Sequence, residues 1–137
     1  MNAILGTYVG VTPTEKTEGL LKEWAEQNNL TLDTGLHVTL LYSRVEVQIE
    51  PEHYSYFKAE PLELCSLGEA ALVLKIKSNS LQMRHDKLMD LGATHDYPEY
   101  NPHLTLMYKG IVPQKLTPIT FDLFFNSEYV EDLDLDR

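Results

Sequence analysis

The spacing of apolar and polar residues predicts a mixed α+β chain. Runs of β-favouring residues, several with alternating polarity, predict strands. The predicted strands are Ala3–Val11, Leu36–Tyr42, Ala71–Lys77, His103–Tyr108 and Ile119–Phe125. Weaker strand signals occur at Val45–Ile49 and Leu62–Leu67, on either side of a break at Pro51. We expect the acidic segment Glu128–Arg137 to form either an edge strand protected by charge or a frayed end.

Capping residues mark the start of a first helix. Thr12 fits the N-cap, Pro13 the first helical position and Glu15 the position three residues after the cap. A hydroxyl at the N-cap accepts a hydrogen bond from a free backbone N–H, and proline lacks the N–H that would otherwise be unpaired there. The sequence therefore predicts a helix from Thr12 to the Asn28-Asn29 pair, with its apolar stripe toward the core.

A second helix lies in a matching position later in the chain. Ser78 or Ser80 provides its N-cap, and it runs to about Leu91 before the stop at Gly92. Each helix is thus flanked by two predicted strands, which gives two strand–helix–strand units of similar length. The sequence predicts one domain over residues 1–137, with halves at roughly 1–68 and 69–137.

The same six-residue motif closes both units. His37-Val-Thr-Leu-Leu-Tyr42 and His103-Leu-Thr-Leu-Met-Tyr108 share four of their six positions, and the other two exchange apolar residues. Matching motifs in matching units indicate an internal duplication. We therefore expect a bilobal, pseudo-twofold arrangement, in which antiparallel sheets line a central cleft and the helices lie outside.

Alternation along a strand predicts which side chains face the cleft. Residues two apart share a face, so His37 and Thr39 point the same way, as do His103 and Thr105. The same rule places the alternate positions of both motifs on the opposite, apolar face, beneath the helices: Val38, Leu40, Tyr42, Leu104, Leu106 and Tyr108. A pseudo-twofold axis brings the two polar pairs to one cleft.

Two imidazoles and two hydroxyls around one point suit the cleavage of a phosphodiester. One histidine removes a proton from an attacking hydroxyl, while the other protonates the leaving oxygen. Thr39 and Thr105 donate hydrogen bonds to the phosphoryl oxygens as charge develops. A ribose 2′-hydroxyl is the expected nucleophile, and the product is a 2′,3′-cyclic phosphate or a 3′-phosphate. The near-symmetry leaves open which of His37 and His103 is the base. The structural alternative is that both are ordinary strand residues.

Charge limits the size of the substrate. The chain has 137 residues, a formal net charge of −10 and a pI near 4.8. Proteins that wrap long nucleic acids usually present a basic surface, so this class is excluded and a small phosphate-bearing ligand is expected. A single cysteine, Cys65, permits no internal disulfide and fits a reducing compartment. The absence of a signal peptide and of a long apolar run predicts a cytoplasmic protein without a membrane contact.

Several other residues are candidates for ligand contacts. Alternation places Tyr8 and Lys75 on the cleft side of their strands, where Tyr8 can stack on a base and Lys75 can attract phosphate. Tyr97 and Tyr100 lie in the loop that leads to the second motif, and Glu131 lies in the acidic tail. For each of these five residues, a solvent-exposed or packing role remains the alternative.

The sequence favours no metal or other cofactor. A zinc site formed by His37, His103 and a carboxylate is conceivable, but local ligand spacing is absent and threonine is a poor zinc ligand. Of the remaining histidines, His85 lies inside the second helix and is expected to be structural. Arg44, which follows the first motif, is either a phosphate contact or a surface residue.

The paired motifs resemble those of the 2H phosphoesterase superfamily, over nearly the whole chain. This resemblance implies a bilobal α+β duplication and metal-independent cleavage of phosphodiester bonds. The segments Gly6-Thr-Tyr-Val-Gly10, Asn101-Pro-His-Leu-Thr-Leu106 and Ser127-Glu-Tyr-Val-Glu-Asp132 resemble those of phage anti-CBASS phosphodiesterases. That resemblance implies destruction of cyclic di- and trinucleotide signals in the cytoplasm of an infected bacterium, which blocks CBASS immunity.

Three other functions remain open at this level. The first is a 2′,5′- or 2′,3′-cyclic phosphodiesterase that acts on RNA ends. The second is a protein that sequesters cyclic nucleotides without turnover. The third is an acidic protein that mimics nucleic acid for a host partner.

Overall fold

The computed structural model describes residues 5–52, 56–67, 71–96, 99–108 and 115–134, and these form six strands and two helices. The chain order is β1 (Leu5–Pro13), α1 (Glu15–Gln27), β2 (Val38–Ser43), β3 (Phe57–Leu67), β4 (Ala71–Lys77), α2 (Asn79–Met89), β5 (His103–Met107) and β6 (Leu123–Asp134). The predicted α+β class is confirmed.

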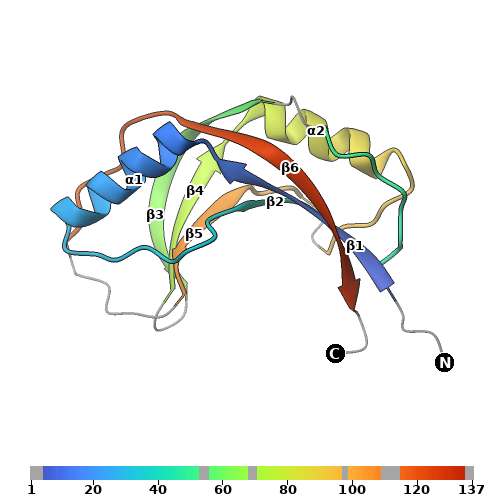
Figure 1. Ribbon diagram of the computed structural model, residues 1–137, viewed down its shortest axis with the longest axis horizontal. Coiled ribbons are helices and arrows are strands. Elements are labelled where there is room, and N and C mark those ends of the chain that lie inside the picture. Colours follow the sequence, from blue (N-terminus) through green and yellow to red (C-terminus); the bar gives the residue numbers. More distant parts are fainter. Residues whose placement is uncertain (1–4, 53–55, 68–70, 97–98, 109–114, 135–137) are drawn as a thin grey trace.

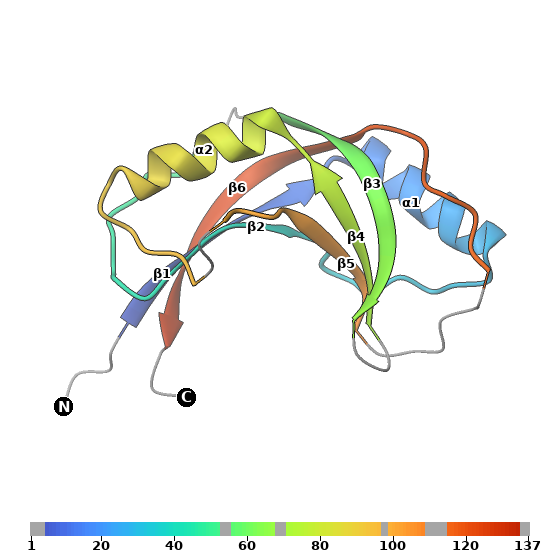
Figure 2. The ribbon, with the colours of Figure 1, turned by 180° about the vertical axis from the view of Figure 1, so that it is seen from behind.

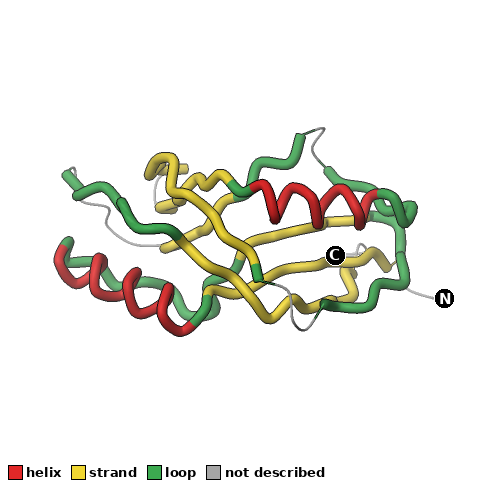
Figure 3. Tube along the Cα trace, turned by 90° about the horizontal axis from the view of Figure 1, so that it is seen from above, coloured by secondary structure: helices red, strands yellow, loops and turns green. Residues whose placement is uncertain are grey.

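The six strands form one antiparallel sheet in the order β2-β1-β6-β3-β4-β5. The sheet is bent into an arch, and both helices lie on its convex side, near opposite ends (Figures 1 and 2). Seen from above, the helices occupy diagonally opposite corners, with the strands passing between them (Figure 3). The expectation of separate sheets is therefore wrong for the described residues, because β3 and β6 pair and join the strands into one sheet.

The bend brings the two ends of the sheet together. β2 and β5 are the outermost strands of the order, yet they contact each other across the concave side. They lie close together beneath the arch in both side views (Figures 1 and 2). β5 carries the second His-x-Thr motif, whereas β2 begins at Val38 and carries Thr39, with His37 directly before it. The fold therefore places both motifs in one region of the molecule.

The core lies between the sheet and the two helices. Leu21 and Trp24 of α1 and Leu81 and Leu88 of α2 are buried. They pack in one apolar cluster with the buried strand residues, which include Phe125 of β6. Each such aliphatic or aromatic side chain stabilises the fold by about 1.5–3 kcal/mol when fully buried. This packing fixes the helix-facing side of the sheet and leaves the opposite side for polar residues.

The acidic segment near the C-terminus is a central strand, not an edge or a frayed end. β6 lies between β1 and β3, and its described part reaches Asp134. Glu128 of this strand is buried and forms a two-point ion pair with Arg84 of α2, with both N–O distances at 2.8 Å. The sequence prediction failed because the carboxylate of Glu128 is neutralised by a residue 44 positions away.

Some predicted boundaries also change. β1 continues to Pro13, and the N-cap of α1 is Thr14, whose hydroxyl accepts a hydrogen bond from the backbone N–H of Thr17. Predicted strand Val45–Ile49 is irregular, and the last strand begins at Leu123 instead of Ile119. The predicted strand Ala71–Lys77 is confirmed at both ends, and Ser78 is the N-cap of α2.

Candidate active site

Both His-x-Thr strands contain a β-bulge at the same position of the motif. In β2, Thr39 pairs with Gly10 and Leu41 with Val9, so Leu40 is an additional residue. In β5, Thr105 pairs with Val73 and Met107 with Leu72, which makes Leu106 the additional residue. A bulge places two consecutive residues opposite one and interrupts the alternation of side chains. The sequence repeat is thus also a repeat of local backbone geometry.

Because of the bulges, Tyr42 and Tyr108 lie on the cleft side of their strands, and their predicted position on the apolar face is wrong. Leu40 and Leu41 are both buried, and so are Leu106 and Met107, which uses two successive positions for the core. The next residue therefore returns to the cleft side. Tyr42 lies beside Tyr8, with ring centroids 6.4 Å apart, and Tyr108 is 58% exposed. The adjacent apolar residues in each motif were the sequence signal for these bulges, because strict alternation does not allow them.

The two histidines have the same anchor. Nδ1 of His37 lies 3.0 Å from the carbonyl oxygen of Gly35, and Nδ1 of His103 lies 3.1 Å from that of Asn101. A carbonyl oxygen only accepts, so each Nδ1 carries the proton and donates. In the neutral ring this leaves the lone pair on Nε2, which is the tautomer that a general base requires. Because each acceptor lies two residues before its histidine, both anchors are local and equivalent.

The first motif is joined to β1 and β6 by tyrosines. The hydroxyl of Tyr8 lies 2.9 Å from Oγ1 of Thr39, and the Tyr8 ring meets that of His37 edge-on at 6.2 Å. The Tyr129 ring lies 6.0 Å from the Tyr8 ring. Burial is the main cause that raises the pKa of the Tyr8 and Tyr129 phenols, so both stay protonated at neutral pH. Sequence reasoning missed Tyr129 because it treated β6 as a tail.

The second motif lies next to charged residues. Lys75 pairs directly with His103 across β4 and β5, and Glu63 pairs with Lys75 across β3 and β4. The Lys75 ammonium lies 3.3 Å from the Glu63 carboxylate, and both side chains are more than half exposed. Directly opposed residues share one face of a sheet, so Lys75, His103 and Thr105 all project to the concave side.

A cleft of about 560 Å³ connects the two motifs. Its lining includes Thr39 and Tyr42 from the first motif and His103 from the second. The other lining residues come from the segment before β5: His95, Asp96, Glu99, Tyr100 and Asn101. This volume lies within the range typical of small-molecule sites. The described structure thus brings Thr39 and His103, from opposite motifs, to a common cavity. His37 and Thr105 are not among the described residues that line it, and the His37 ring instead contacts that of Tyr8.

Comparison with known proteins gives the family. Residues 5–137 match the model of the family described as Anti-CBASS protein Acb1. A protein of that name from Vibrio phage KVP40 is 33% identical over 138 residues, covering 96% of this chain and 89% of its own length. Those of Enterobacteria phage T4 and Acinetobacter phage Ac42 are 34% and 35% identical, covering 96% and 95% of this chain and 90% and 92% of the relatives. The chain belongs to the Anti-CBASS protein Acb1 family.

The remaining candidate residues differ in their surroundings in this Acb1 family member. Glu131 pairs with Tyr8 across β6 and β1, so it projects toward the same side as the tyrosines. Tyr100 lines the cleft, but its hydroxyl donates to the carbonyl oxygen of Thr39 at 2.7 Å and its ring stacks on His85. Arg44 forms an ion pair with Asp96 at 2.8 Å. Tyr97 lies outside the described residues.

His85 has the structural role expected of it. Its ring is buried, stacks on Tyr100 with centroids 4.3 Å apart, and lies 2.6 Å through Nδ1 from the carbonyl oxygen of Leu40. Among the described residues of this Acb1 family member, no group of three or more histidine, cysteine, aspartate or glutamate side chains is arranged to hold a metal ion. Neither described helix has the length and apolar character needed to cross a membrane.

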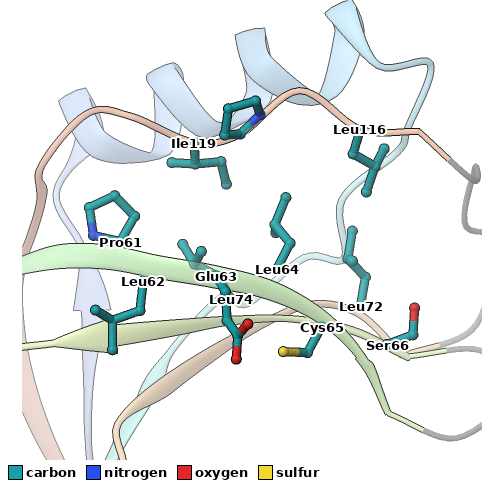
Figure 4. Close-up of a pocket in the computed structure, with 11 residues that line it drawn as sticks. Pro61, Leu62, Glu63, Leu64, Cys65, Ser66, Leu72, Leu74, Leu116 and Ile119 are labelled. Carbon is teal, nitrogen blue, oxygen red and sulfur yellow. The ribbon is translucent and has the colours of Figure 1, made fainter.

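A second hollow lies away from both motifs. It measures about 470 Å³ and is formed by β3, β4 and the segment at residues 116–119 (Figure 4). Leu64 points toward Leu116 and Ile119, while Glu63 and the Cys65 sulfur lie on the other side of the strand (Figure 4). Most of the described side chains around this hollow are aliphatic or proline, and it lacks the paired histidine and threonine groups that distinguish the first cleft.

Proposed function

We propose that this chain is a metal-independent phosphodiesterase that cleaves 3′–5′ bonds of cyclic di- and trinucleotides and thereby blocks CBASS antiphage immunity. The observation that carries the proposal is the equivalence of the two motifs. Each has a histidine anchored through Nδ1, a threonine on the same face and a bulge at the same position, on strands that contact each other. We interpret this equivalence as the pseudo-twofold duplication of a 2H phosphoesterase.

The reaction uses the two histidines as base and acid. One Nε2 takes the proton from a ribose 2′-hydroxyl, whose oxygen attacks the neighbouring phosphorus. The bond from phosphorus to the 5′-oxygen breaks, and the other imidazolium protonates that oxygen. The product carries a 2′,3′-cyclic phosphate, which water can open to a 3′-phosphate. The near-equivalent anchors of His37 and His103 allow either assignment of base and acid.

The threonines stabilise the charge that develops on the phosphoryl oxygens. The hydroxyl groups of Thr39 and Tyr8 form a hydrogen bond, in which either group can be the donor. When Tyr8 donates, the Thr39 hydroxyl proton is available for a phosphoryl oxygen. Thr105 projects from the same face as His103 and supplies the second donor. Hydrogen-bond donors that are fixed before the reaction stabilise the transition state without reorganisation.

The class of substrate follows from charge, size and family. A net charge of −10 repels a long polyanion, whereas a small cyclic nucleotide meets only the local cleft. The relatives from phages carry the name Anti-CBASS protein Acb1. We therefore expect the protein to act in the infected host cell on a cyclic oligonucleotide, with Tyr8, Lys75 and Glu131 as contacts to its bases and phosphates.

The proposal is tested by incubating the protein with 3′,3′-cyclic dinucleotides and cyclic triadenylate in EDTA and identifying the products by mass spectrometry. We expect linear products with a 3′-phosphate or a 2′,3′-cyclic phosphate. The 2′-deoxy cyclic dinucleotide is the matched substrate control and should remain intact, because it lacks the nucleophile. Intact ribose substrates with a well-folded protein would contradict the proposal, and tight binding without turnover would favour sequestration.

The acid and base roles are tested with His37→Ala and His103→Ala. Each variant should lose about 10²- to 10⁴-fold in turnover while still binding the substrate in calorimetry. The rate of the unmodified protein should have a bell-shaped dependence on pH. Cleavage of linear 2′,5′-linked or RNA-end substrates at a higher rate than cyclic ones would instead favour a nucleotide-processing phosphodiesterase.

A further inference from the structure

The bulged backbone of β2 is held by two histidine rings. Nδ1 of His85 lies 2.6 Å from the carbonyl oxygen of Leu40, and the backbone N–H of Tyr42 donates to Nδ1 of His95 at 3.2 Å. β2 is an outermost strand of the sheet, so these backbone groups lack a neighbouring strand on that side. The two rings therefore satisfy backbone groups that the bulge and the sheet edge leave unpaired.

The equivalent backbone atoms of β5 are held by one aspartate. The backbone N–H of Asp33 donates to the carbonyl oxygen of Leu106 at 2.9 Å, and the N–H of Tyr108 donates to Oδ2 of Asp33 at 2.7 Å. Leu106 and Tyr108 occupy the same motif positions as Leu40 and Tyr42. In both halves, the same carbonyl and the same N–H of the bulge are thus fixed from outside the sheet.

The contacts are exchanged between the halves. Asp33 lies in the connection from α1 to β2 but holds β5, whereas His95 lies in the connection from α2 to β5 but holds β2. Thr94 extends the second contact, because its hydroxyl accepts from the backbone N–H of Arg44 at 2.9 Å. Each half therefore provides the residue that fixes the motif of the other half.

We propose that His95 and Asp33 are reciprocal positioning residues, which hold the bulges of β2 and β5 so that the threonine and tyrosine of each motif face the concave side of the sheet. This inference rests on the proposed function for its kinetic consequence, although the backbone contacts exist independently of it. Displacement of a reacting group by about 1 Å can cost about 100-fold in rate. Loss of either contact should therefore lower kcat strongly and change the affinity for the substrate less.

The two contacts differ in chemistry. Asp33 accepts through a carboxylate, whereas His95 accepts through Nδ1 and must keep a lone pair there. The groups around the His95 ring are His85 and Tyr100, with ring centroids at 4.8 and 6.1 Å, and the neighbouring Asp96, which pairs with Arg44. Burial, followed by repulsion from His85, lowers the pKa of His95 below its usual 6.5, although Asp96 opposes the shift. The β2 contact is thus intact at neutral pH and is lost in acid.

The first test follows the backbone amides by NMR and needs no substrate. In the unmodified protein, the Tyr42 amide shift should change with pH at the same midpoint as the His95 ring protons. His95→Asn keeps an acceptor oxygen near the Nδ1 position, so the pH dependence of the Tyr42 amide should disappear. The Tyr108 amide, held by Asp33, serves as the internal comparison and should not follow that midpoint. A Tyr42 amide shift that stays constant while the His95 ring titrates would overturn the inference.

The second test is kinetic. His95→Ala and Asp33→Ala should each lower kcat about 10- to 100-fold with KM changed less than about threefold. His95→Asn and Asp33→Asn retain an acceptor and should recover most of that loss. Asp122→Ala, which removes only an exposed partner of Lys58, is the matched control. Equal losses from the alanine and asparagine variants, or a change in KM alone, would contradict positioning. If the unmodified protein cleaves no cyclic nucleotide, the proposed function is wrong. The NMR test still shows whether His95 holds the Tyr42 amide.

Discussion

The hydroxyl of Tyr8 lies 2.9 Å from Oγ1 of Thr39, and this contact joins β1 to the first His-x-Thr motif. It exists because the two residues lie on the concave side of adjacent antiparallel strands, with the bulge at Leu40 setting the side chain of Thr39. A phenol that stays protonated can donate to the threonine and leave the threonine proton for a substrate.

Tyr8→Phe tests this contact directly. The variant keeps the ring that meets His37 and removes only the hydroxyl, so we expect kcat to fall about 3- to 10-fold, the effect of one hydrogen bond. Steady-state kinetics on a cyclic dinucleotide measures the change. Tyr56→Phe is the control, because Tyr56 is 62% exposed and stacks on Phe124. An unchanged kcat in Tyr8→Phe would show that the Tyr8 hydroxyl does not contribute to catalysis.

Gly10 is predicted to be intolerant of a larger side chain. A Cβ at this position would lie 2.6 Å from the hydroxyl oxygen and 2.8 Å from Cζ of Tyr129. Gly10→Ala should therefore displace the Tyr129 ring and cost about 1–3 kcal/mol in the free energy of unfolding, as overpacking does. Urea denaturation measures the loss. Combination with Tyr129→Ala should recover part of it, and a purely additive double variant would exclude the clash as the cause.

The Glu128–Arg84 ion pair is predicted to stabilise the attachment of α2 to the central strand. The Glu128 side chain is fully buried and that of Arg84 is 11% exposed. Glu128→Gln leaves the guanidinium without its buried counter-charge, and we expect unfolding to become easier by about 3–5 kcal/mol. The exposed pair Lys58–Asp122 gives the comparison, since Asp122→Asn should cost less than about 1 kcal/mol. Similar costs for the two substitutions would show that burial of Glu128 does not matter.

Alkaline pH is predicted to destabilise the fold through three tyrosines. The pKa values of Tyr8, Tyr100 and Tyr129 are raised in the folded state, with burial as the largest cause. Their contribution to stability is fully present below the unfolded pKa of about 10. Above that pH the unfolded chain loses these protons first, so the free energy of unfolding falls as pH rises toward the folded pKa values.

Urea midpoints measured between pH 9 and 11 test this prediction. The unmodified protein should lose stability across this range, and Tyr100→Phe should lose less, because the most strongly buried of the three phenols has been removed. Tyr56→Phe is again the control and should keep the original slope. A flat dependence in the unmodified protein would contradict the raised pKa values.

The two motifs show which features of the site could be predicted from the sequence and which could not. The repeat identified His37, Thr39, His103 and Thr105 as equivalent pairs. The structure places Thr39 on β2, with His37 directly before that strand, and His103 and Thr105 on β5, and the two strands contact each other. The direction of Tyr42 was predicted wrongly because alternation was applied across Leu40-Leu41. A bulge depends on which residues of the neighbouring strand pair with it, and that pairing is not local.

Alternation, helix caps and the duplicated motif are local properties, so the α+β class, most of the elements and the paired His-x-Thr residues could be predicted from the sequence. Tertiary structure decided three further points: the central position of β6, the burial of Glu128 against Arg84, and the exchange of Asp33 and His95 between the halves. Each of these depends on partners at least 44 residues apart in the chain, which meet only when the sheet and the helices have packed around their common core.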